Sequence, residues 1–185
     1  MTFATYEKSG RVATVTLNRP ESRNAIATQK DCDDLAGALW RANDDPEINA
    51  LVLTGAGKSF CAGGDLKAIR ERSGIGPRAT PDGTRANYRR GVHSIIKALA
   101  DIEVATIAAI NGHALGLGLD IGILCDIRLA GASAKMASSF VKVGIIPGDG
   151  GAWILTNAIG ASRAAELVLT GDTIDADEAA RIGLV

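Results

Sequence analysis

The segment VATIAAINGHALGLGLD occupies residues 104–120 and decides the class of fold. Its first part, Val104–Ile110, is apolar and rich in β-branched residues, which predicts a buried strand. Asn111 and Gly112 interrupt this strand, and small residues then lead into an apolar run over 117–125 that favours a mostly buried helix. A strand, a turn of small residues and a helix are the unit from which α/β folds are built.

The same alternation extends on both sides of this segment. Val12–Leu17 and Ala50–Thr54 are short β-branched runs that end in turn residues, and a further strand is expected over 127–130. Between the first two runs, apolar residues recur with helical spacing from Cys32 to Trp40. Because no repeat of fixed period and no linker interrupts the pattern, the sequence predicts one α/β domain over residues 1–185.

Other helices are expected from spacing and capping signals. A short helix is predicted over 65–71, a helix from Tyr88 to Leu99, and a last short helix from Asp175 to Gly183. The segment 73–83 contains Gly, Pro and Thr with few apolar residues, and it is therefore predicted to be a loop.

Composition and charge exclude several classes of protein. Of 185 residues 46 % are hydrophobic and 22 % charged, which is enough for a packed core. Twenty Lys and Arg against 21 Asp and Glu leave a net charge of −1, which argues against a nucleic-acid partner. The apolar runs are shorter than the roughly 20 residues that span a membrane. Three cysteines without a C-x-x-C pair, and no signal-peptide pattern, lead us to expect a cytoplasmic protein without a structural metal.

Two glycine-rich turns resemble phosphate-binding loops, but the spacing of their residues is wrong. A P-loop ending at Gly57–Ser59 needs a glycine where this chain has Val52. A dinucleotide fingerprint needs G-x-G-x-x-G, whereas Gly116 and Gly118 are followed by Gly122. A nicotinamide or nucleoside-triphosphate enzyme is therefore disfavoured.

The same regions suit the stabilisation of an oxyanion. Ala62, Gly63 and Gly64 follow a strand and would let a ligand carbonyl approach the main chain. The helix that opens near Gly116 begins with amides that lack intrahelical partners. Two such turns could direct two N–H groups at one oxygen, and the alternative for either turn alone is a simple tight connection between a strand and a helix.

Five pieces of the sequence, in this order, resemble the crotonase superfamily of enoyl-CoA hydratases and isomerases. They are LNRPESRNA at 17–25, SFCAGGDL at 59–66, NGHALGLGLD at 111–120, CDIR at 125–128 and GIIPGDGG at 144–151. LTGD at 169–172 and the segment 179–185 fit as well, so the resemblance covers essentially the whole chain. Each piece alone is weak, but the ordered set is specific.

The resemblance implies a spiral of ββα units, assembled into a homo-trimer or hexamer, that binds an acyl-CoA thioester. The thioester carbonyl would lie between two backbone amides, which by position belong to Ala62 and Leu117. An enolate-like oxygen is stabilised there without a metal, and coenzyme A enters as part of the substrate, with no separate cofactor. The residues implied along the substrate are Arg23, Asn24, Ala25, Ala62, Gly63, Gly64, Asp65, Gly116, Leu117 and Phe140.

Several positions depart from the family pattern. Family members often have glycine where this chain has Leu117. Hydratases carry two glutamates where this chain has Asp120 and Phe140, and because a phenyl ring transfers no proton, efficient two-carboxylate hydration is not expected. Asp149 is the substitute, so we expect Asp120 or Asp149 to move a proton at the acyl chain. The alternatives are a helix partner for Asp120 and a capping role for Asp149 at the helix beginning near Gly151.

Length is the last departure. Family members generally continue beyond 179–185 into C-terminal helices that cover the active site and help to form the trimer. We therefore expect a core domain that is short at its C-terminus and exposes apolar surface. The alternative to an enzyme is a truncated CoA-binding or interaction protein without efficient catalysis.

Overall fold

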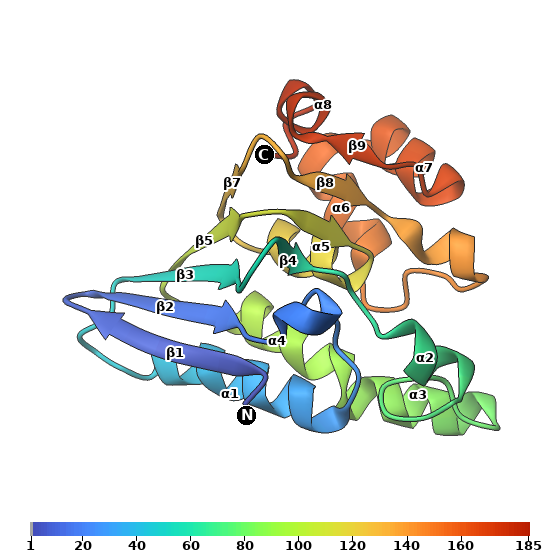
Figure 1. The fold of residues 1–185 in the computed structure, drawn as a ribbon, viewed down its shortest axis with the longest axis horizontal. Helices are drawn as coiled ribbons and strands as arrows, with labels where there is room; N and C mark the ends of the chain where they lie inside the picture. Colours follow the sequence, from blue (N-terminus) through green and yellow to red (C-terminus); the bar gives the residue numbers. More distant parts are fainter. Residues whose placement is uncertain (1) are drawn as a thin grey trace.

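The computed structural model describes residues 2–185 and contains two sheets. Five strands form the first sheet, in which β1 and β2 are antiparallel and all other neighbours are parallel. Their order is β1 (Ala4–Ser9), β2 (Val12–Leu17), β3 (Ala50–Gly55), β5 (Ala105–Ile110) and β7 (Ile127–Ala130). Figure 1 shows them side by side, from the blue N-terminal hairpin to β7.

The second sheet is smaller and positions the site. It contains β4 (Ser59–Cys61), β6 (His113–Leu115), β8 (Lys135–Ala137) and β9 (Ile174–Asp175), with the first three parallel and β9 antiparallel to β8. Each of β3, β5 and β7 is followed by one strand of this sheet and then by helical structure, so the chain advances in ββα units. This confirms the predicted α/β spiral.

Helices pack around the two sheets. None of those within residues 2–185 has the length and apolar character that a passage through a lipid bilayer requires. They are α1 (Gln29–Asn43), α2 (Leu66–Arg70), α3 (Pro81–Arg90), α4 (Val92–Asp101), α5 (Leu117–Ile123), α6 (Gly151–Ile159), α7 (Ala161–Thr170) and α8 (Ala176–Arg181), with 3-10 turns η1 (Pro20–Ser22) and η2 (Ser139–Val143).

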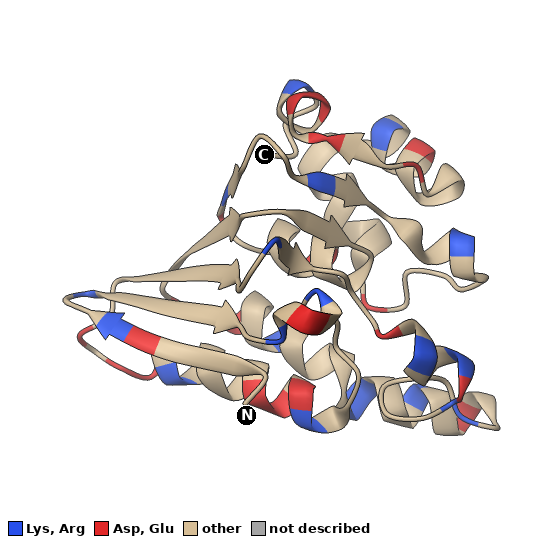
Figure 2. Ribbon diagram, in the orientation of Figure 1, with Lys and Arg blue, Asp and Glu red and all other residues tan. Residues whose placement is uncertain are grey.

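The core is formed by alternate residues of the strands and by one face of α1. Ala13, Val15 and Leu17 of β2 are completely buried, and the intervening residues are half-buried. Leu35 and Leu39 of α1, one turn apart, are buried in the same core. Figure 2 shows that β3 and β5 carry no charged residue, whereas charges are frequent on α1, α3 and α8. The apolar strands therefore form the interior, with charged helices outside.

Two helices differ from the expectation. The helix predicted from Tyr88 to Leu99 is divided into α3 and α4 at Gly91, whose φ of −95° and ψ of −108° are not helical, and the Gln29 side chain packs there. α3 begins at Pro81, so the end of the segment 73–83 predicted to be a loop is helical. The second unpredicted feature is α7, which begins directly after Gly160. Gly160 has a φ of +80°, so it turns the chain sharply between two helices that the sequence pattern does not separate.

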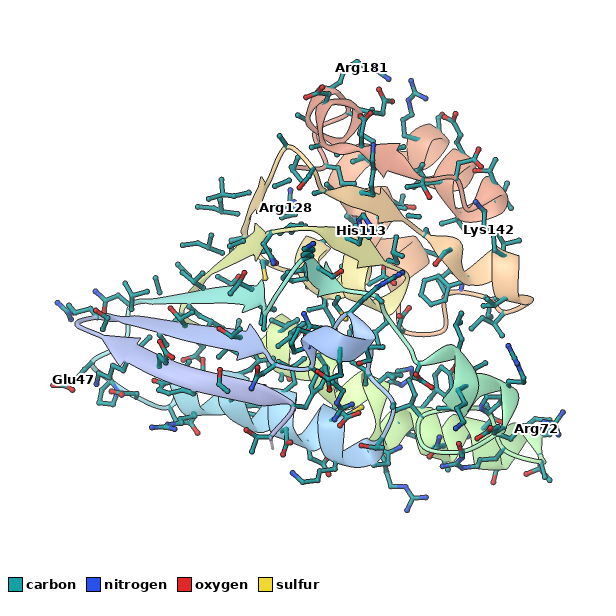
Figure 3. All side chains as sticks on the ribbon, viewed as in Figure 1. Glu47, Arg72, His113, Arg128, Lys142 and Arg181 are labelled. Atoms are coloured by element: carbon teal, nitrogen blue, oxygen red, sulfur yellow. The ribbon has the colours of Figure 1, made fainter. Side chains whose placement is uncertain are left out.

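The last residues are held to the first sheet by Arg128, which Figure 3 labels. Its Nε donates to the carbonyl oxygen of Leu184 at 2.7 Å, and its Nη1 donates to that of Cys125 at 2.9 Å. The Leu184 side chain is completely buried in the hydrophobic core. Residues up to 184 therefore belong to the core around the two sheets.

Candidate active site

The two glycine turns that follow β4 and β6 are in contact. These strands are parallel neighbours, so their carboxyl ends lie at the same edge of the second sheet. A Cβ at Gly63 would lie 2.4 Å from the Leu115 carbonyl oxygen and 3.3 Å from the Leu117 nitrogen, and a Cβ at Gly118 would lie 2.2 Å from the Cys61 carbonyl oxygen. The close approach of the two turns therefore requires glycine at both positions.

The peptide N–H of Ala62 is not available to a ligand. It donates to the carbonyl oxygen of Arg23 at 2.9 Å, within the turn that follows η1. The prediction that Ala62 supplies one of the two amides is therefore wrong. Its motif identifies the turn correctly, but the motif does not tell which N–H of the turn is already bonded.

Two other N–H groups of these turns, those of Gly64 and Leu117, donate to no acceptor within residues 2–185. Gly64 forms a parallel bridge with Ile26. The hydrogen bonds of this bridge are made by the two neighbours of Gly64: Ile26 N donates to Gly63 O, and Asp65 N donates to Ile26 O, both at 2.8 Å. The Gly64 N–H therefore points away from that bridge. Leu117 is the first residue of α5, where no intrahelical acceptor exists.

Both residues line one pocket with a volume of about 70 Å³. Its other walls are mainly aliphatic, and Phe140 of η2 and Tyr88 of α3 contribute aromatic rings. Asp149 is the one acidic residue in the described wall. Of the residues predicted along the substrate, the pocket brings together Ala62, Gly64, Gly116, Leu117 and Phe140.

Asp120 and Asp149 both approach Gly151: Asp149 Oδ1 lies 3.3 Å from the Gly151 nitrogen, and a Cβ at Gly151 would lie 2.2 Å from Asp120 Oδ2. Asp120 is completely buried and Asp149 is 5 % exposed. No donor within residues 2–185 bonds to either oxygen of Asp120, whereas Oδ1 of Asp149 accepts the Gly151 N–H at 3.3 Å. Burial, and then the neighbouring charge of Asp149, raises the pKa of Asp120 well above its ordinary value. Burial also raises the pKa of Asp149, although the nearby Asp120 carboxyl group and the Gly151 N–H oppose the shift.

Asn24 supports the glycine turn after β4 through both the nitrogen and the oxygen of its side-chain amide. Its Nδ2 donates to the carbonyl oxygens of Ala56, Ser59 and Phe60 at 2.9–3.1 Å, and its Oδ1 accepts the Arg19 N–H at 2.9 Å. Asn24 is fully buried, so the contact with the substrate predicted for it cannot come from its side chain.

The remaining residues of the first turn have mixed roles. Asp65 caps α2, because its Oδ1 accepts the Ala68 N–H at 2.7 Å. Direct contacts of Arg23, Ala25 and Asp65 with coenzyme A stay predictions.

Sequence reasoning missed the ion pair that anchors α1. Arg19 donates to both oxygens of Asp31, at 2.8 and 2.6 Å, and Asp31 Oδ2 also accepts the N–H groups of Ala27 and Thr28. Burial tends to raise the pKa of Asp31, but Arg19 and the two amides hold it below its ordinary value. The capping-box spacing of Thr28 and Asp31 was the signal that could have found it.

Cys61 is a structural thiol. It is completely buried, and its Sγ donates to the carbonyl oxygen of Asn24 at 3.1 Å. Burial raises its pKa to about 12, so the thiolate needed for nucleophilic attack is not formed at neutral pH.

Replacing Asp120 by asparagine is expected to remove a pH dependence of stability. A carboxyl group with a raised pKa in the folded state binds more protons there than in the unfolded chain, so the free energy of unfolding falls as pH rises above the unfolded value of 3.8. If the folded protein binds one proton more than the unfolded chain, the free energy of unfolding changes by about 1.4 kcal/mol per pH unit in that window.

Urea unfolding of the unchanged protein and of Asp120→Asn between about pH 4 and pH 8 measures this difference in slope. The control is Asp177→Asn on the exposed surface of α8, and parallel curves for Asp120→Asn and the unchanged protein would contradict the expectation.

Comparisons with known proteins agree with this architecture. The profile of the family described as Enoyl-CoA hydratase/isomerase matches residues 7–185. The chain is 38 % identical over 187 residues to the probable enoyl-CoA hydratase echA8 of Mycobacterium bovis, covering 100 % of this chain and 68 % of that protein. It is 41 % identical over 182 residues to the short-chain-enoyl-CoA hydratase of Clostridium acetobutylicum, covering 97 % and 66 %.

Solved structures give the same result. The crystal structure of an enoyl-CoA hydratase/carnithine racemase from Magnetospirillum magneticum superposes with a TM-score of 0.91 at 31 % identity, covering 100 % of this chain and 67 % of that one. The chain therefore spans about two thirds of the length of these relatives.

Proposed function

The chain belongs to the enoyl-CoA hydratase/isomerase family, the crotonase superfamily, and on that basis we propose that it acts on the double bond of an acyl-CoA thioester. The observation that carries the proposal is the pair of unbonded N–H groups, on Gly64 and Leu117, in the wall of one pocket. In this proposal the thioester carbonyl oxygen accepts a hydrogen bond from each. Relatives named as enoyl-CoA hydratases support the class of substrate.

The two donors would stabilise the charge that develops in the reaction. When a proton leaves the carbon next to a thioester carbonyl, negative charge accumulates on the carbonyl oxygen. Donors that are already fixed in an apolar pocket need no reorganisation at that moment, and each contributes about 3 kcal/mol in comparable sites. The Leu117 side chain does not remove its backbone donor, so the departure from glycine leaves the proposed hole intact.

Asp149 is the proposed proton carrier, because it is the one acidic residue in the described pocket wall. Phe140 occupies the pocket where the family pattern has a second glutamate, which supports a mechanism without a two-glutamate pair. Charge stabilisation and proton transfer both use groups of this chain, so the proposal includes no cofactor besides the coenzyme A of the substrate.

Assembly into a trimer or hexamer and a cytoplasmic location belong to the same proposal. Apolar side chains on the outer helices support assembly, because Trp153 of α6 is 72 % exposed and Leu169 of α7 is 73 % exposed. Further protein packed on these helices would bury both.

Turnover of short thioesters tests the proposed function. The protein is mixed with short enoyl-CoA thioesters, both the conjugated compound and its non-conjugated isomer, and the absorbance of the conjugated double bond is followed. Loss or formation of that bond is the expected result. Binding of the thioesters without any turnover would reject the enzymatic activity and favour a CoA-binding protein. Thermal stabilisation by NAD or ATP, with none by coenzyme A, would reject the proposed substrate class as well.

A further inference from the structure

We infer that Asp120 and Asp149 form a carboxyl pair that holds one proton, in which Asp149 exchanges protons with the substrate and Asp120 is a positioning residue. The identity of the substrate rests on the proposed function, but the shared proton is a property of the folded chain alone. The pair thus differs from two independent acid–base groups, because one of its members never meets the acyl chain.

The two carboxyl groups have different access to the pocket. Asp149 lies in the loop before α6 and forms part of the pocket wall. Asp120 belongs to the first turn of α5, is completely buried, and is not part of that wall. The first residue of α6 closes over it, since a Cβ at Gly151 would lie 2.2 Å from Asp120 Oδ2. In this inference Asp149 contacts a bound acyl group, whereas Asp120 contacts Asp149, because both carboxyl groups approach Gly151.

The hydrogen-bond donors near the two carboxyl groups assign the proton to Asp120. Two ionised carboxylates in an apolar interior would repel each other and would both lack water. Asp149 already accepts the Gly151 N–H, but no donor within residues 2–185 bonds to Asp120. When Asp120 is protonated, its O–H donates to Asp149, and every oxygen that carries charge then has a donor.

The other ionisable groups near the pair are His93 and Tyr88. His93 of α4 faces the loop of Asp149, with its Nε2 2.7 Å from the Gly148 carbonyl oxygen. Tyr88 of α3 lies in the pocket wall, and burial and then the Asp149 charge raise its pKa. Tyr88 therefore stays neutral and adds no charge to the pocket.

During the reaction the pair would move one proton in each step. The C–H bond next to the thioester carbonyl breaks, its proton passes to a carboxylate oxygen of Asp149, and its electron pair is delocalised onto the thioester oxygen. The proton of Asp120 stays in place throughout. Asp149 then returns one proton to the carbon skeleton, which restores the starting charge of the pair.

Matched asparagine variants separate the two roles. Asp149→Asn is expected to lower kcat by about 10²–10⁴-fold, because the proton carrier is lost. Asp120→Asn is expected to keep kcat within about tenfold, because the amide N–H replaces the O–H that donates to Asp149. The control is the exposed Asp177→Asn, with unchanged kcat. If Asp120→Asn loses as much activity as Asp149→Asn with unchanged thioester affinity, Asp120 itself carries the proton and the inference is overturned.

Titration measures the shared proton without any substrate. Carbon-13 NMR of carboxyl-labelled aspartate, in the full chain, is expected to detect one protonated carboxyl at neutral pH and an alkaline step that disappears in Asp120→Asn. The alkaline limb of the kcat profile should disappear in the same variant, which a merely structural role of Asp120 would not cause. Two ionised carboxyls at neutral pH would overturn the inference. If the unchanged protein converts no thioester, the proposed function fails and the titration still decides the pair.

Discussion

Replacing the peptide N–H of Gly64 or of Leu117 by an ester oxygen is expected to lower kcat for a thioester substrate by about 10²–10³-fold each. Glycolic acid at position 64 and leucic acid at position 117, introduced by semisynthesis or nonsense suppression, change one donor and leave the side chain unaltered. The loss follows because each of these two N–H groups is unbonded within residues 2–185 and lies at the pocket. Thioester kinetics of the two ester proteins measure the effect.

The matched control is an ester at Ala62, in the same turn. The Ala62 N–H donates to Arg23, so its removal is expected to cost stability of about 1 kcal/mol while kcat stays within a few-fold of the unchanged protein. A large loss of kcat at Ala62 together with none at Gly64 would reverse the assignment of the donor. Equal losses at all three positions would point to damage of the turns and reject the hole.

Much of the fold could be predicted from local patterns. Strands β2, β3 and β5 are short β-branched runs ended by turn residues, and the burial of alternate residues follows from their position in a sheet. The helix is divided at Gly91, where the Gln29 side chain packs, and because Gln29 is distant in sequence no local pattern contains this contact. The α6–α7 boundary was missed because a single residue, Gly160, separates the two helices.

The candidate site was less accessible to sequence reasoning. The motif around Ala62–Gly64 identifies a turn. Which N–H group of that turn stays free depends on hydrogen bonds to Arg23 and Ile26, and these residues lie more than 35 positions away in the sequence. The proximity of Asp120 and Asp149 is likewise tertiary, because Asp120 of α5 and Asp149 of the loop before α6 both approach Gly151. Residue type indicated proton transfer at both positions, and the separate roles that we infer for them rest on their spatial relation.

Asn24→Asp is expected to destabilise the protein by about 3–5 kcal/mol at neutral pH, the cost of a buried charge left without a partner. The substitution conserves shape but replaces a donor by an oxygen facing the carbonyls of Ala56, Ser59 and Phe60. Desolvation would raise the pKa of the new carboxyl group, so the folded protein would bind more protons than the unfolded chain and the destabilisation would grow as pH rises. Urea unfolding at neutral and mildly acidic pH measures both effects.

The same substitution at an exposed position distinguishes the cost of a buried charge from any general effect of replacing an amide by a carboxyl group. Asn49 is exposed, and Asn49→Asp is expected to change stability by no more than about 0.5 kcal/mol. Because Asn24 bridges the Arg19 turn to the end of β4, thioester affinity should fall with stability in Asn24→Asp and recover as the pH is lowered. Stability within about 1 kcal/mol of the unchanged protein at neutral pH would mean that the turn relaxes around the new oxygen, and the anchoring role of Asn24 would then be wrong.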